Sequence, residues 1–155
     1  TYMGNKLNNK KGENMSKYNV YQIKEREWKK KHREQNKDIL FVGSKNYLPT
    51  DFESFKKVCT VNANGGLVQG ENPYVIDSLE EVFKVLNGAY YNEEQNEDIV
   101  FDNHVSDFEM KTITRDNGEV VTFRNMHSLS IGDIVEKDGV HMMCDKRGWT
   151  QVEVA

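Results

Sequence analysis

MHSLSIGDIVEKDGVHMMCDKRGWTQVEV, residues 126–154, is the stretch of sequence that decides the fold. Short apolar runs in it are separated by glycine-containing turns at Gly132, Asp138-Gly139 and Gly148. A tight Asp-Gly pair between two strand-like runs is typical of a β-hairpin. We therefore expect a hairpin over residues 131–144, followed by a last strand over residues 150–154.

Working outward, three further stretches favour strands. Residues 18–23 alternate large apolar and polar side chains, which indicates a half-buried strand. The apolar run 38–43 ends in glycine and predicts a short buried strand, and residues 57–62 predict another. Residues 110–123 predict a second hairpin, because Asn117-Gly118 is the pair that a two-residue turn with positive φ at both positions prefers.

The helix signals lie between these strands. Residues 78–87 place Leu79, Val82, Phe83 and Leu86 on one face of a helix, with Asp77 as the expected cap and Glu80 at capping-box spacing. Residues 48–51 favour the start of a short second helix, and the charged stretch 24–37 is typical of an exposed helical arm. Together these patterns predict an α+β fold, with two or three helices packed on antiparallel strands and the C-terminal strands forming a small twisted β-sheet or half-open barrel.

The domain organisation follows from composition. Residues 1–14 are polar, rich in Asn and Lys, and without periodicity, so we expect a disordered leader, with Met15 as a possible native start. Residues 15–155 are expected to form a single α+β domain. Within it we distinguish an N-terminal αβ part (15–88), an acidic loop (89–109) and a C-terminal β part (110–155).

The charge is unevenly distributed. The net charge of the chain is −4, yet residues 1–37 carry eleven Lys or Arg against four Glu, a net of +7, which leaves −11 for the rest. Such a split concerns partners rather than fold. No apolar run reaches the roughly 20 residues that a membrane span needs, and the start of the chain lacks the apolar core of a signal peptide. We expect a cytoplasmic protein with Cys59 and Cys144 as reduced core thiols.

The segment Ser128-Leu129-Ser130-Ile131-Gly132-Asp133, followed by Cys144 and by Gly148-Trp149, resembles the YodL-like domain. Residues 18–24 are similar to the opening strand of that family, and residues 79–87 are similar to its helix ending in Asn. Two departures are an insertion of about forty residues (88–127) and Met142-Met143 where the family often has a tyrosine. The resemblance implies a small accessory protein of a phage, a plasmid or another mobile element. It implies no catalytic residues.

Catalytic signatures are weak in this sequence. The glycine-rich run 64–70 lacks both the P-loop ending and the dinucleotide-binding spacing, so we interpret it as a turn. Asp102, His104 and Asp107 could bind a metal, but a solvated acidic loop is the more frequent explanation. His127 and Ser128 are adjacent, and neighbours on a strand point to opposite faces. We expect no enzyme activity, no metal and no cofactor.

Two charged segments are candidates for contact with a macromolecule. Carboxylates along an exposed loop can imitate a phosphate backbone, as in counter-defence proteins that capture host nucleic-acid enzymes; the candidates for binding a host protein are Glu93, Glu94, Glu97, Asp98 and Asp102. The alternative is a nucleic-acid-binding module that uses the basic segment 24–37; its candidate contacts are Lys29, Lys30, Lys31 and Arg33. Interleaved glutamates weaken the field of that segment.

Trp149 could cover one end of the C-terminal sheet or serve as an exposed aromatic anchor for a partner. The leading hypothesis from the sequence is therefore a non-catalytic accessory protein of a mobile element that binds a host macromolecule, most simply a protein.

Overall fold

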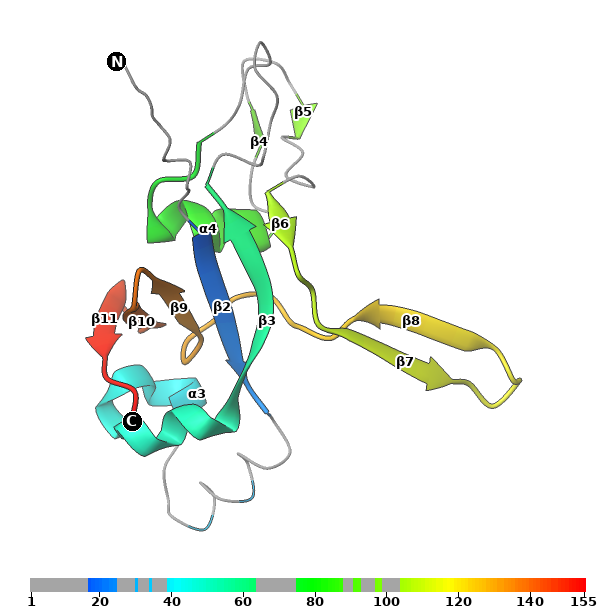
Figure 1. Ribbon diagram of the computed structural model, residues 1–155, viewed down its shortest axis with the longest axis horizontal. Helices are drawn as coiled ribbons and strands as arrows, with labels where there is room; N and C mark the ends of the chain where they lie inside the picture. The colour runs from blue at the N-terminus through cyan, green and yellow to red at the C-terminus, as the bar shows by residue number, and fades with distance from the viewer. Residues whose placement is uncertain are drawn as a thin grey trace.

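The computed structural model describes residues 17–24, 30, 34, 39–63, 75–87, 91–92, 97–98 and 104–155, and these form a mostly β structure (Figure 1). The expected leader over residues 1–14 and the Met15 start lie outside the described residues.

A six-stranded antiparallel sheet forms the body of the protein, in the order β11-β10-β9-β2-β3-β6. Its strands are β2 (Lys17–Ile23), β3 (Phe55–Asn62), β6 (Val105–Ser106), β9 (Ile134–Lys137), β10 (Val140–Cys144) and β11 (Trp149–Val152). Because β9 pairs with β2, the C-terminal strands are one half of this sheet. The expectation of a separate C-terminal sheet or half-open barrel is therefore wrong.

Two small two-stranded sheets lie outside the body. One pairs β4 (Tyr91–Asn92) with β5 (Glu97–Asp98), inside the segment expected to be an acidic loop. The other pairs β7 (Met110–Thr114) with β8 (Val120–Arg124) and projects from the sheet as an arm (Figure 1). We call β7, β8 and their connecting turn the arm.

Helical structure is scarce among the described residues, so the predicted α+β class with two or three helices on strands is wrong. The helical elements are α3 (Ile39–Val42), the 3₁₀ turns η1 (Gly43–Asn46) and η2 (Pro49–Ser54), and α4 (Leu79–Leu86). Of the two α-helices whose bounds the structure describes, α3 has four residues and α4 has eight. The buried strand expected over residues 38–43 is instead α3, since a short apolar run alone does not distinguish a strand from a buried helical turn.

Both faces of the sheet are covered by apolar side chains. On one face, Val82 of α4 packs in a cluster with Tyr18, Val20 and Val135. On the other face, Ile39 of α3 packs with Ile134, Met143 and other residues of a second cluster. Alternate residues of a strand point to opposite faces, and β2, β3, β9 and β11 each contribute to both clusters. The two layers fix β9 and β10, and with them the loop that joins β8 to β9.

Local signals refine two sequence predictions. The cap of α4 is Ser78, whose Oγ accepts from Glu81 N at 3.2 Å, one residue later than the predicted Asp77–Glu80 pair. In the arm, Arg115 N donates to Glu119 O, and Gly118 is the residue of the 116–118 loop with positive φ. This loop therefore has three residues, not two. The Asp138-Gly139 turn has positive φ at both positions, as predicted.

Candidate functional site

The two charged segments singled out by the sequence are largely outside the described residues. This holds for Glu93, Glu94 and Asp102 in the acidic loop, and for Lys29, Lys31 and Arg33 in the basic segment. Glu97 and Asp98 form β5, of which the backbone alone is described. Lys30 is exposed. The binding roles of the acidic loop and of the basic segment stay predictions.

Trp149, for which the sequence left open a structural role or a role as an aromatic anchor, starts β11 and is partly buried against the cluster under α4. Its ring also lines a groove of about 490 Å³ between α4, the loop before β9 and the β10–β11 turn. This volume lies in the range of roughly 300–1,000 Å³ that is usual for ligand sites. Trp149 is thus both a packing residue and an accessible one. We call this hollow the Trp149 groove; its lining includes Glu80, Phe83, Leu129, Ile131, Lys146 and Trp149.

Asp145 fixes the far wall of the groove. Its carboxylate accepts from Ser44 N at 2.9 Å, from Ser44 Oγ at 2.6 Å and from Thr150 Oγ1. Partial burial by itself raises the pKa of Asp145, but the hydrogen bonds from Ser44 and Thr150 outweigh burial, and the pKa is lowered. The carboxylate is therefore engaged in holding η1 against the β10–β11 turn.

Behind the groove, Asp133 is fully buried. Its Oδ2 accepts from Ser130 N at 2.9 Å and from Gln22 Nε2 at 3.1 Å, while Oδ1 has no hydrogen-bond partner among the described residues. Burial raises the pKa of Asp133 to about 7, against the opposing effects of nearby His127 and the two hydrogen bonds. The group is a proton-binding site inside the fold.

Two side-chain amides hold the loop before β9. Gln22 of β2 donates to His127 O at 2.9 Å and accepts from His127 N at 3.2 Å. Asn87, at the end of α4, pairs in the same way with Leu129, at 3.0 and 2.6 Å. The sequence offered no signal for either role, since an isolated Gln or Asn is common on any surface.

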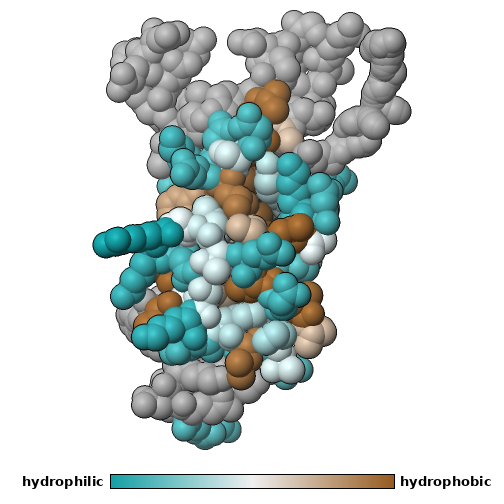
Figure 2. Space-filling model, turned by 90° about the vertical axis from the view of Figure 1, so that its left-hand side faces the viewer, coloured by the Kyte–Doolittle hydropathy of each residue, from teal (hydrophilic) through white to brown (hydrophobic). Residues whose placement is uncertain are grey.

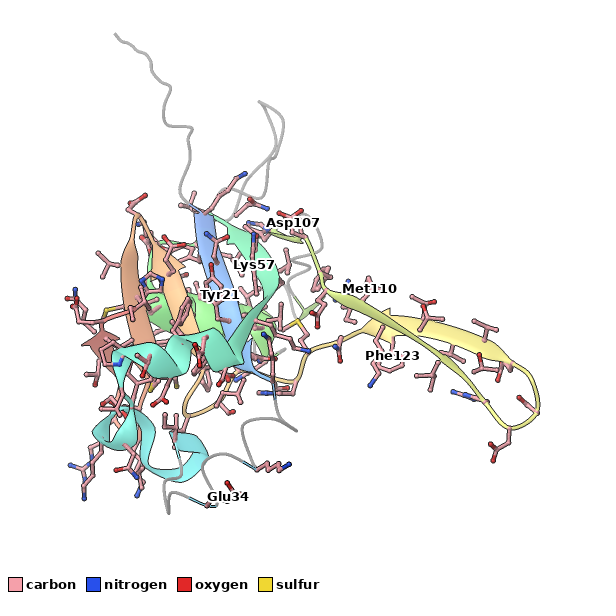
Figure 3. The ribbon with its side chains drawn as sticks, turned by 60° about the horizontal axis from the view of Figure 1, so that its bottom comes forward. Tyr21, Glu34, Lys57, Asp107, Met110 and Phe123 are labelled. Carbon is pink, nitrogen blue, oxygen red and sulfur yellow. The ribbon has the colours of Figure 1, made fainter. Side chains whose placement is uncertain are left out.

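The base of the arm is attached firmly to the sheet. Glu109 N donates to Val58 O at 2.9 Å, and the Glu109 carboxylate accepts from Lys56 at 2.6 Å and from Asn125 at 2.7 Å. Beside this base, the guanidinium of Arg124 lies 3.8 Å from the ring centroid of Phe108. The arm therefore projects in a defined direction (Figure 3).

Beyond its base the arm packs on nothing that the structure describes. Every residue of β7 is exposed, and the apolar ones include Met110 and Ile113. In β8, Val120 and Phe123 are exposed and Val121 is half-buried. Figure 3 shows Met110 and Phe123 standing clear of the six-stranded sheet. Val121 thus lies on the arm and belongs to neither core cluster.

Side chains that could support catalysis are poorly arranged in the described part of the chain. Burial raises the pKa of Cys59 to about 12 and that of Cys144 to about 11, so both thiols are protonated near neutral pH. His127 Nδ1 lies 2.6 Å from the Ser128 carbonyl oxygen. His104 is buried, whereas Asp107 is exposed. No cluster of three metal-binding side chains occurs among the described residues.

Comparisons with known proteins give no further guide. No family model, no curated protein and no solved structure matches this chain. No helix within the described residues is long and apolar enough to span a membrane. The YodL-like resemblance therefore stays a hypothesis.

Proposed function

We propose that this chain is a non-catalytic accessory protein of a mobile element, and that it acts in the cytoplasm by holding a host protein through the β7–β8 arm. The resemblance to the YodL-like domain suggests the setting, in which counter-defence is one role. The single observation that carries the binding role is the arm, a ribbon with exposed apolar side chains and unpaired edges in the described structure.

The arm has the composition of a surface that is completed by a partner. Pairing places Ile113 opposite Val121, with Phe123 opposite Lys111 on the same face. Apolar residues arranged in this way along a rigid strand pair are typical of protein contacts. An isolated two-stranded ribbon is at best marginally stable in water, so a partner that covers this face would stabilise it.

The charges of the arm favour a protein over a nucleic acid. Arg115 pairs with Glu119 at 3.2 Å across the turn, and Arg124 stacks on Phe108. Asp116 adds a negative charge at the tip. Of the three cations between residues 110 and 124, two are thus already engaged, which is a poor basis for phosphate contacts.

Affinity capture from a bacterial host lysate tests this proposal. The wild-type chain should retain a protein after nuclease treatment, and the double variant Ile113→Glu, Phe123→Glu should lose it, because two charges would be buried without partners in the interface. Val140→Glu is the matched control, since Val140 is also apolar and 42% exposed but lies outside the arm. All three proteins should melt within about 2 °C of one another, as expected for surface substitutions.

Three outcomes would overturn the arm as the docking surface. One is equal capture by the double variant, and another is capture that nuclease abolishes, which would favour the nucleic-acid alternative and the basic segment 24–37. The third is loss of capture on replacing Glu93, Glu94, Glu97 and Asp98 by serine while the arm variant still binds. That result would assign the role to the acidic loop.

A further inference from the structure

We propose that the outer edge of β11 and the adjoining Trp149 groove form a second binding site, which takes an extended peptide segment of a partner protein with an uncharged apolar side chain. The peptide would add as a strand beside β11 and place that side chain in the groove. This site lies at the opposite end of the sheet from β6. It does not depend on the arm.

The backbone of β11 is ready for strand addition. The hydrogen bond from Asp145 N to Gly148 O fixes which residues of β11 bond to β10. The backbone N–H and C=O groups of Thr150 and Val152 point toward β10. The N–H and C=O groups of Trp149 and Gln151 then point outward, where the structure describes no strand. The site ends at Glu153, whose carbonyl accepts from Tyr47 Oη at 2.8 Å.

β11 also lacks the features that usually protect an edge strand. Its sequence, Trp-Thr-Gln-Val, contains neither a charged residue nor proline. The strand at the opposite edge, β6, has two residues, and so short an edge strand offers little backbone for pairing. In Figure 2, which turns the β11 side of the molecule toward the viewer, hydrophobic patches interrupt the hydrophilic surface.

The groove determines which side chain the peptide brings. Phe83, Leu129, Ile131 and Trp149 make its apolar lining. Glu80, Asp145 and Lys146 together carry a net charge of −1, but the Asp145 carboxylate is already engaged by Ser44 and Thr150. The apolar part of the lining therefore selects the side chain, and it favours an uncharged apolar one. Strand geometry directs every second peptide side chain to the face of the sheet that carries Trp149.

A second copy of this chain fits the edge less well. Two β11 strands related by a twofold axis use the outward groups of both Trp149 and Gln151 when Thr150 lies on the axis. That register puts the polar Gln151 of the second copy opposite Trp149, and the groove would receive no apolar side chain. A foreign peptide is free of this constraint.

Selection from a phage-displayed library of random seven-residue peptides tests the site. Enriched sequences should share an apolar residue at one position, flanked by β-forming residues. A synthetic peptide of the winning sequence is then titrated while the fluorescence of Trp149 is followed in a Trp28→Phe background, because the chain has two tryptophans.

The decisive variant is Gln151→Pro. Proline removes an outward N–H and blocks the approach of a strand, but it costs no bond to β10, because the Gln151 N–H faces away from that strand. Binding should weaken by about tenfold or more in Gln151→Pro, and it should be unchanged in the matched control Gln151→Ala. Ile131→Glu, which charges the groove, should weaken binding to a similar extent.

Equal affinity of wild type and Gln151→Pro would overturn the proposal, as would a selection that enriches no common sequence. A dimer that Gln151→Pro converts to a monomer would show instead that a second copy occupies the edge. The arm variant Ile113→Glu, Phe123→Glu should bind the peptide normally. Failure of this site and failure of the arm are therefore distinguishable.

Discussion

The free energy of unfolding should fall by roughly 4 kcal/mol between pH 4 and pH 7 because of one carboxyl group, Asp133. Burial raises the pKa of Asp133 from its usual 3.8 to about 7. Between these two values the folded protein binds a proton that the unfolded chain has already released. Stability from this group is therefore complete below pH 4 and is lost as the pH rises to 7.

Asp133→Asn is the variant that isolates this effect. The asparagine oxygen can still accept from Ser130 N and Gln22 Nε2, but its side chain does not titrate. Urea denaturation of both proteins at intervals from pH 4 to pH 8 should give a falling profile for the wild type and a flatter one for the variant. Above pH 7 the difference between the two free energies of unfolding should no longer change with pH. Parallel profiles would show that Asp133 is ionised throughout this range.

Much of the strand content could be predicted because strand patterns and tight turns are local. Residues 18–23 alternate, and they form β2. The turn at Asp138-Gly139 has positive φ at both positions, a conformation that few other residues tolerate, and it joins β9 to β10 as expected. The periodic face of residues 79–86 likewise identified α4.

The predictions that failed depend on distant contacts. The order of the strands is set by β2, which pairs with β3 across about forty residues and with β9 across more than a hundred, and no local pattern encodes either pairing. Residues 39–42 form α3 because Ile39 is buried against strands on one face of the sheet. In the arm, Asn117-Gly118 suggested a two-residue turn, but the Arg115–Glu119 pair closes a longer loop.

The candidate sites show the same division. Trp149 could be singled out from the sequence, since a large aromatic residue after a glycine is conspicuous. The groove beside it could not, because α4 and the loop before β9 complete it from elsewhere in the chain. In the sequence Asp133 follows the glycine of a turn, and Gln22 is one polar residue of an alternating strand. Their joint burial became visible only when the strands were assembled.

Gly132→Ala should destabilise the protein by about 2–3 kcal/mol. Gly132 has a φ of +96°, where an L side chain is strained, and an added Cβ would lie 3.1 Å from both the carbonyl oxygen and Cγ2 of Ile39. Ile39 is fully buried, so it has little room to move away. Asp133, the next residue, would be displaced along with this contact.

The variant Gly139→Ala separates the cost of backbone strain from the cost of the contact with Ile39. Gly139 has a φ of +84°, so its replacement carries a similar backbone strain, but an added Cβ there would meet nothing within 4 Å. Its cost should be about 1 kcal/mol, and urea denaturation of the two variants gives the difference as the contribution of the contact with Ile39. Equal costs would mean that the loop before β9 can shift freely over α3. In that case the side-chain amides of Gln22 and Asn87 would not hold the loop as tightly as their hydrogen bonds indicate.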